Sequence, residues 1–245
     1  MPASAPASEL VLPPQVWRGR ELAQAQERTL PSGHAALDAQ LPGGGWPLGN
    51  LIEVLQQEQQ QHVWQLLGPA LAQAMAARGE PAVLVGAPYQ PFGPALRAQG
   101  IVPERLLCVQ ADRASARLWA AEQSLRCADV CAVLAWLPQA RSEELRRLHL
   151  CAQATEKLLV VFRPVPARDQ ATPARLRLLV QGAEVLELHI LKRRGPPLLQ
   201  TLLLPAQPER LSALLAARKS RRRSEPALPA WSGSHVLDRT ATLAG

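Results

Sequence analysis

Short apolar runs alternate with longer helix-forming stretches through the middle of the chain, and this alternation constrains the fold more than any other feature. The apolar runs, which we predict to be strands, cover residues 51–55, 81–86, 106–109, 130–136 and 158–163. The stretches between them, which we predict to be helices, cover residues 63–78, 92–99, 113–126 and 142–155. Strands separated by helices of this length form a parallel sheet with helices on both faces. We therefore predict an α/β fold built on a mostly parallel sheet.

The pattern changes after Arg163, where a loop at 164–173 leads to three apolar runs with no helix between them. These runs cover residues 176–180, 185–191 and 198–204, and they are joined by Gly182 and by the Gly-Pro-Pro sequence at 195–197. Connections this short permit only hairpins. The C-terminal strands are therefore predicted to be antiparallel.

Composition divides the 245 residues into three parts, and the middle part is long enough for one α/β core. Residues 1–14 are rich in Pro, Ala and Ser, and we predict a disordered tail there. Residues 15–205 form the predicted α/β domain, which begins with short helices at 16–28 and 34–40, the second capped by Ser32. Residues 206–245 are predicted to hold a basic helix at 209–218 and then a disordered tail.

The loop between the first predicted strand and the first long helix has the position of a phosphate-binding loop but not its residues. Such a loop reads G-x-x-x-x-G-K-[ST] and uses glycines to wrap the backbone around phosphates, lysine as a charge and a hydroxyl to hold Mg²⁺. Counting from the strand end, the same positions hold Gln56, Gln61, His62 and Val63. Two glutamines, a mostly neutral imidazole and an isopropyl group cannot do these tasks. We therefore expect neither a nucleotide cofactor nor a metal at this site.

The segment before this loop contains three short motifs. They are LPSG at 30–33 with Leu37-Asp38, LPGGGWPLG at 41–49, and Ile52-Glu53-Val54. Together they resemble the segment that precedes the phosphate-binding loop in RecA-type recombinases. They resemble still more closely the ImuA-like accessory proteins of bacterial translesion synthesis. The resemblance runs from about Trp17 to Pro205 and implies a RecA-like fold of the P-loop NTPase type that lacks an ATP site. The glycines at 43–45 also predict a loop that approaches other backbone closely.

The same resemblance locates two carboxylates that a RecA-type ATPase needs for activating water and for holding Mg²⁺. Their places are taken by Pro88 and Leu134, neither of which can act as a base or bind a metal. Elsewhere the histidines lack a partner at a diagnostic spacing, and Cys108, Cys127, Cys131 and Cys151 lack zinc-site spacing. We therefore expect no catalysis, no ATP hydrolysis and no metal.

Basic residues are the main candidates for binding surfaces. The formal net charge of +7 is compatible with nucleic-acid contact without identifying it. If the sheet is parallel, the lost nucleotide site, Trp136 and the loop after Arg163 should meet at its carboxyl edge, which in RecA also carries the DNA-binding loops. DNA contact there is a hypothesis for Arg163, Arg168, Arg175 and Arg177, and the alternative is a solvated or partner-facing loop.

Two further features are candidates for partner contact. Lys192, Arg193 and Arg194 resemble a basic segment that reaches the neighbouring subunit in RecA filaments, so they could grip an acidic partner. They could equally be hairpin charges that block strand pairing. Trp46, between glycines and a proline, is predicted to be an exposed interface anchor. Trp64 and Trp119 lie on predicted helices and are expected in the core.

The resemblance implies an accessory protein of SOS-induced, error-prone translesion synthesis that acts by protein contacts. The implied partners are an ImuB-like polymerase-family protein and an error-prone replicative-type DNA polymerase, with RecA as a further candidate. The alternatives are a SulA-like cell-division inhibitor that binds FtsZ, a residual ATPase, and a RecA-modulating or DNA-binding module. The N-terminus lacks the features of a secretory signal, and no run of about 18 apolar residues occurs, so we expect a cytoplasmic location and no membrane contact.

Overall fold

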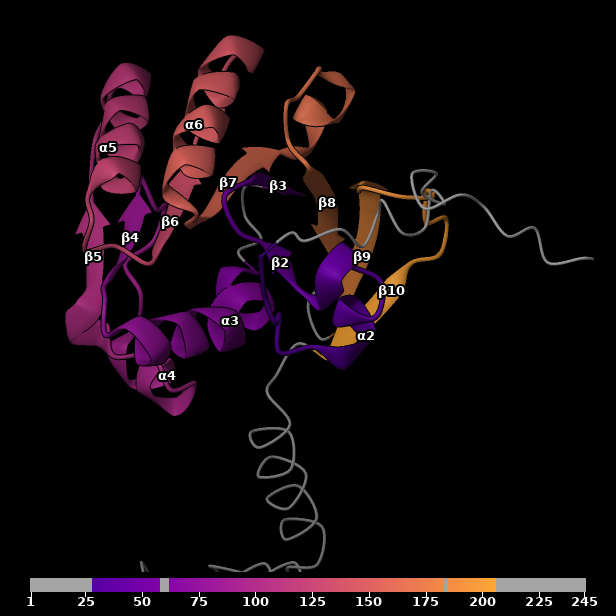
Figure 1. The fold of residues 1–245 in the computed structure, drawn as a ribbon, viewed down its shortest axis with the longest axis horizontal. Coiled ribbons are helices and arrows are strands. Elements are labelled where there is room, and N and C mark those ends of the chain that lie inside the picture. The colour runs from indigo at the N-terminus through magenta and orange to yellow at the C-terminus, as the bar shows by residue number, and fades with distance from the viewer. Residues whose placement is uncertain (1–27, 58–61, 183–184, 206–245) are drawn as a thin grey trace, which may run out of the picture. The chain divides into compact units, whose positions relative to one another are not determined.

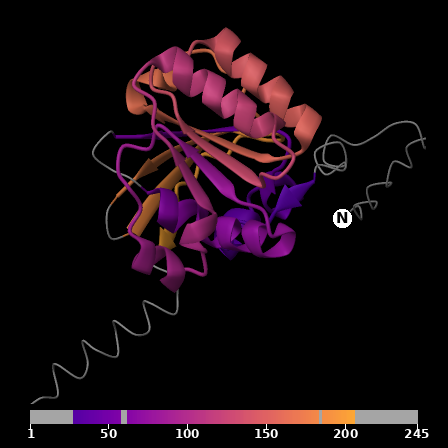
Figure 2. The same ribbon diagram turned by 90° about the vertical axis from the view of Figure 1, so that its left-hand side faces the viewer.

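A computed structural model of the chain describes residues 28–57, 62–182 and 185–205. The helices predicted at 16–28 and 209–218 and the two predicted tails therefore lie outside the described residues, except for Arg28. Within the described part, the chain forms an α/β fold with helices on both faces of a central sheet (Figures 1 and 2). The α/β class predicted from the alternating pattern is confirmed.

The central sheet has eight strands in the order β10-β9-β8-β3-β7-β6-β4-β5 (Figure 1). Six strands pair in parallel: β3 (Leu51–Gln56), β4 (Ala82–Val85), β5 (Leu106–Val109), β6 (Ala132–Trp136), β7 (Leu158–Pro164) and β8 (Leu176–Gln181). The last two, β9 (Val185–Lys192) and β10 (Leu202–Pro205), pair antiparallel. The antiparallel extension is thus as predicted. However, β10 starts four residues later than expected, because Pro196 and Pro197 cannot donate ladder hydrogen bonds and the chain must first turn.

Two pairs of helices cover the two faces of this sheet. One face carries α3 (Val63–Arg78) and α4 (Gly93–Ala98), and the other carries α5 (Ala114–Arg126) and α6 (Ser142–Thr155), as Figure 2 shows. Strands β3, β4 and β6 are buried along their whole length, and β4 and β6 accordingly read as unbroken apolar runs, whereas β3 also buries Glu53 and Gln56. None of the described helices has the length and apolar character needed to cross a membrane.

Short elements before β3 form a second, two-stranded sheet whose apolar residues join the main core. Strands β1 (Thr29–Leu30) and β2 (Trp46–Pro47) pair antiparallel, and α2 (Ala35–Asp38) and a 3-10 turn (Pro42–Gly44) lie between them. A Cβ on Gly45 would lie 2.4 Å from the carbonyl oxygen of Leu30, so the predicted close backbone approach of the triple glycine is confirmed. The predicted cap is wrong, because His34 is the N-cap of α2 and the Ser32 hydroxyl instead accepts a hydrogen bond from the His34 amide.

Two tryptophans lie in environments opposite to those predicted. Trp46 is 0% exposed and belongs to the core beneath α3, so it is not an exposed partner anchor. Trp119 is 64% exposed on α5, although its helical position suggested the core. The β1–β2 pairing turns the Trp46 side chain inward, and a sequence of glycines and prolines gives no local signal of that burial.

Candidate functional site

A pocket of about 550 Å³ opens at the carboxyl edge of the sheet. The edge forms because β3, β4, β6 and β7 run parallel and their carboxyl ends meet there. Ligands of open α/β sheets bind at this edge. The lining comes from the strand ends and from α5: Gln56, Gly86, Ala87, Pro88, Tyr89, Gln110, Arg117, Trp136, Pro138, Phe162, Arg163 and Pro164. Gln56, Trp136 and Arg163 thus meet at the carboxyl edge, as predicted for the strand end, the tryptophan and the loop.

The loop predicted to take the position of a phosphate-binding loop lies between strand β3 and helix α3. Gln56 ends β3 with its side chain buried, and His62 is buried at the start of α3. Burial lowers the pKa of His62, so its imidazole is neutral at pH 7. Val63 packs into the core. Gln61, the fourth of these positions, lies outside the described residues. The three described side chains therefore supply neither a cation nor a metal-binding hydroxyl.

The two predicted carboxylate positions lie in different places. Pro88 lines the pocket just after β4, and its assignment to the place of a water-activating carboxylate stays a prediction. Leu134 is fully buried in the middle of β6, where it faces the core shared with α3. None of the described residues that line the pocket is acidic. In the described part of the chain, no group of three potential metal ligands comes together either.

An aromatic pair lies beside the pocket. Trp136 at the end of β6 stacks on Phe162 of β7, with ring centroids 4.5 Å apart and an interplanar angle of 17°. The pairing follows from register, because Trp136 and Phe162 are direct neighbours in the β6–β7 ladder. Both side chains are nearly buried, and they present an apolar, rigid wall to a ligand.

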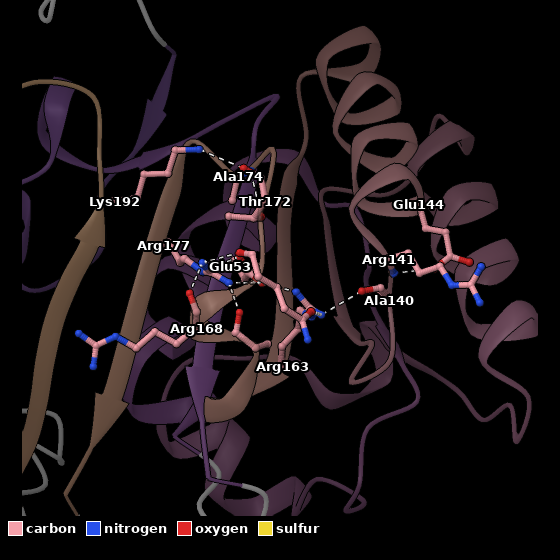
Figure 3. A network of polar contacts seen from close by, with 12 residues as sticks. Glu53, Ala140, Arg141, Glu144, Arg163, Arg168, Thr172, Ala174, Arg177 and Lys192 are labelled. Carbon is pink, nitrogen blue, oxygen red and sulfur yellow. Dashed lines mark hydrogen bonds and ion pairs between the residues drawn. The ribbon is translucent and has the colours of Figure 1, made fainter.

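A buried ionic network adjoins the pocket through Arg163, and Figure 3 shows its members. Glu53 of β3 is 0% exposed and forms ion pairs of 2.9 Å with both Arg163 and Arg177. Arg163 also donates to the carbonyl oxygen of Ala140 at 2.9 Å and to the Gln170 amide oxygen at 2.6 Å. Arg177 donates to carbonyl oxygens of the turn that follows β7. Two arginines share one carboxylate, so the network carries a net charge of +1.

This network corrects the view of Arg163 and Arg177 as free DNA contacts. Arg163 is 3% exposed and Arg177 is 7% exposed, and both guanidinium groups are held by internal acceptors. Sequence alone gave no sign of this, because Glu53 lies more than 100 positions from either arginine and only the β3–β7 and β3–β8 ladders bring them together.

The other predicted basic contacts divide between the two ends of the sheet. Arg168 is exposed in the 3-10 turn Val165–Asp169, at the carboxyl edge. Arg175 precedes β8 and therefore lies at the amino edge, which corrects its expected place beside Arg163. There it lines a shallow hollow together with Arg193 and Arg194.

The remaining contacts of the basic triplet are internal. Lys192 donates to the carbonyl oxygen of Thr172 at 3.1 Å, and Arg193 donates to the carbonyl oxygens of Pro196 and Gln40. Lys192 and Arg193 therefore fix the end of β9 to neighbouring loops. Whether it also contacts a partner stays a prediction.

Arg117, Gln110 and Tyr89 belong to the pocket and were not predicted from the sequence. The Nε–H of Arg117 donates to the carbonyl oxygen of Ala111 at 2.6 Å, and the side chain lies over Gly86, where a Cβ would be 2.9 Å from the Arg117 Cδ. One signal was available. Arg117 lies in the first turn of a helix that follows a parallel strand, and that turn always faces the carboxyl edge.

His149 lies away from the pocket and ties α6 to the start of β3. Its Nδ1 accepts a hydrogen bond of 3.1 Å from the Leu51 amide, which requires the neutral imidazole with hydrogen on Nε2. Burial, followed by the charges of Arg175 and Lys192, lowers the pKa of His149 below its usual value of 6.5. Protonation would remove the acceptor and add a third positive charge.

We therefore expect the free energy of unfolding to fall as the pH decreases from about 6.5 through the lowered pKa of folded His149. In that window the unfolded chain binds more protons than the folded one, so acid favours unfolding. Urea unfolding at a series of pH values should show a flatter pH profile for His149→Gln than for the parent chain. His189→Gln is the control, since it makes the same change at another histidine that has a side-chain hydrogen bond, to Thr201, away from α6 and the start of β3. Parallel profiles for the parent and His149→Gln would contradict the assignment.

Comparison with known proteins gives no family for the chain. A scan against models of protein families found no match, and a search of curated proteins found no significantly similar sequence. What the chain does must therefore be inferred from its pocket, its strand–loop–helix junction and its charges.

Proposed function

We propose that the chain is a non-catalytic protein with a RecA-like fold that acts as an ImuA-type accessory factor in SOS-induced, error-prone translesion synthesis. It works in the cytoplasm by protein contacts and neither binds nor hydrolyses ATP. Its partners are an ImuB-like polymerase-family protein and an error-prone replicative-type DNA polymerase, with RecA as a further candidate. The resemblance of residues 30–54 supplies the identity of the process and of the partners.

One observation carries the non-catalytic part of the proposal. The frame of a phosphate-binding site is kept in β3 and α3, whereas Gln56, His62 and Val63 occupy the described ligand positions. Phosphoryl transfer depends on a fixed cation, a bound Mg²⁺ and a carboxylate that orients the nucleophile. The described pocket residues contain no carboxylate. A strand–loop–helix junction without a cation, a metal ligand or a carboxylate is suited to docking a partner protein.

The fold and the motif residues support the proposal in a second way. A parallel core with an antiparallel extension agrees with the resemblance to RecA. Three residues of the motifs at 41–49 and 52–54 have structural roles. Gly45 allows the close approach of β1 and β2, Trp46 fills the core and Glu53 pairs with the buried arginines. These residues hold the scaffold together without any nucleotide.

Co-purification tests the proposal. The tagged full chain should recover polymerase components from cells of its source after DNA damage, because translesion partners are abundant only then. Undamaged cells and the tag alone are the controls. Recovery of neither polymerase components nor RecA from damaged cells would count against the proposal, and recovery of FtsZ would favour the cell-division alternative.

A further inference from the structure

The pocket at the carboxyl edge has an excess of positive charge. It is lined by two arginines, Arg117 and Arg163, and by no acidic residue of the described chain. Arg163 forms an ion pair with Glu53, but the same carboxylate also pairs with Arg177. The network therefore has one more positive charge than negative charges. Arg117 is held in place by the carbonyl oxygen of Ala111. An anionic ligand would therefore be favoured here.

The rest of the lining is apolar, aromatic or uncharged polar. The Trp136–Phe162 stack forms a rigid wall, and Tyr89 stands at the opening with 63% of its surface exposed. Gln56 and Gln110 contribute amide groups. A volume of about 550 Å³ is large enough for two or three side chains and too small for a folded domain element. The ligand should combine one negative charge with a large apolar group.

This chemistry fits a peptide better than a nucleic acid. Single-stranded nucleic acids bind in grooves where several cations follow the phosphates in succession. Here a single guanidinium, that of Arg117, is not engaged with the buried carboxylate. A second hollow that shares Arg117 is lined by Asp112, Glu144 and Arg141, so its charges balance and it does not extend a row of cations for successive phosphates. A bound peptide with an acidic residue next to a large apolar residue would place one negative charge and one hydrophobic group in the pocket.

We propose that this pocket binds an acidic peptide segment of a partner protein, in which an Asp or Glu carboxylate contacts Arg117 and an adjacent large apolar side chain packs on Trp136 and Tyr89. The inference deepens the proposed docking function and rests on it, since it names the docking site and the partner's chemistry. The carboxylate accepts hydrogen bonds from the guanidinium, and the aromatic wall supplies apolar burial.

Binding can be followed by NMR on the ¹⁵N-labelled full chain, using the indole N–H of Trp136 and the Nε–H of Arg117. The probes are a blocked hexapeptide with two glutamates followed by phenylalanine and leucine, the same peptide with glutamines, a six-nucleotide oligothymidylate, and Mg-ATP. We expect the acidic peptide to shift both signals and to bind at least about tenfold more tightly than the glutamine peptide, as charge-assisted hydrogen bonds imply.

Substitutions locate the site. Arg117→Ala should weaken binding of the acidic peptide about tenfold, whereas Arg113→Ala, which removes the same charge from an exposed residue outside the pocket, should change it less than about twofold. Tyr89→Ala is a second test that carries little folding risk, because this side chain is mostly exposed. This substitution should weaken binding of the acidic peptide and of the glutamine peptide by the same factor.

Equal binding of the two peptides, no binding of either, or an Arg117→Ala variant with full affinity would overturn the inference. Tighter binding of oligothymidylate that is lost in Arg117→Ala would also overturn it, in favour of a nucleic-acid site. These results would leave the proposed function standing. Binding of Mg-ATP in this pocket would instead overturn the proposed function itself, so the two failures are distinguishable.

Discussion

Glu53→Ala is expected to lower the free energy of unfolding by about 3–5 kcal/mol, because it leaves two buried guanidinium groups without their carboxylate. Arg163 and Arg177 are almost completely buried and cannot regain water without opening the sheet. A typical domain is stable by only about 5–15 kcal/mol, so this single change consumes a large part of the total. The effect is large because the two guanidinium charges stay buried without a carboxylate. It is therefore not a measure of the net contribution of the ion pairs to stability.

Urea unfolding monitored by circular dichroism measures this loss. Glu104→Ala is the matched control, because it also removes one carboxylate from an ion pair with an arginine, Arg97, but at the surface. Its unfolding midpoint should stay close to that of the parent chain, since exposed pairs contribute little. Equal shifts for Glu53→Ala and Glu104→Ala would contradict the buried network.

Trp46→Ala is expected to cost about 3–5 kcal/mol of stability, as truncation of a large buried aromatic side chain does. Trp46 is fully buried and packs in the core with α2 and α3. Trp46→Phe should cost less, because the indole N–H has no hydrogen-bond partner among the described residues and its loss leaves no acceptor unpaired.

Trp119→Ala is the control for this prediction, since the side chain of Trp119 is mostly exposed on α5. Its unfolding free energy should change by less than about 1 kcal/mol, as is usual for surface substitutions. If Trp46→Ala were stable and Trp119→Ala unstable, Trp46 would be exposed and Trp119 buried, as the sequence pattern suggested. That result would contradict the structure.

The elements of the α/β core were predictable from sequence because their signals are local. Helices α3 and α6 and strand β5 have the predicted bounds, since helical stretches and apolar runs are separated by prolines, glycines and polar residues. The antiparallel end of the sheet was also predictable, because Gly182 and the Gly-Pro-Pro turn leave no room for a crossover. Such signals depend on a few neighbouring residues.

The environments of single side chains were less predictable, because they depend on which strands become neighbours. Arg175 was placed at the wrong edge and Glu53 was not connected to its arginines, since both depend on β8 lying parallel beside β3. The place of Arg117 in the first helical turn after a strand predicts only that it faces the carboxyl edge, whereas its meeting with Trp136 and Arg163 depends on the β4–β6 and β6–β7 pairings. The assignment of Gln56, Gln61, His62 and Val63 to the positions of a phosphate-binding loop rests on spacing along the chain and stays a prediction.

The central claim is that the frame of a nucleotide site has become a docking surface, and equilibrium binding of a fluorescent ATP analogue in the presence of Mg²⁺ tests it most directly. With the full chain we expect no saturable binding up to millimolar nucleotide and no release of phosphate on prolonged incubation. A micromolar dissociation constant that disappears in His62→Ala would contradict the claim, since it would place a nucleotide at the junction of β3 and α3.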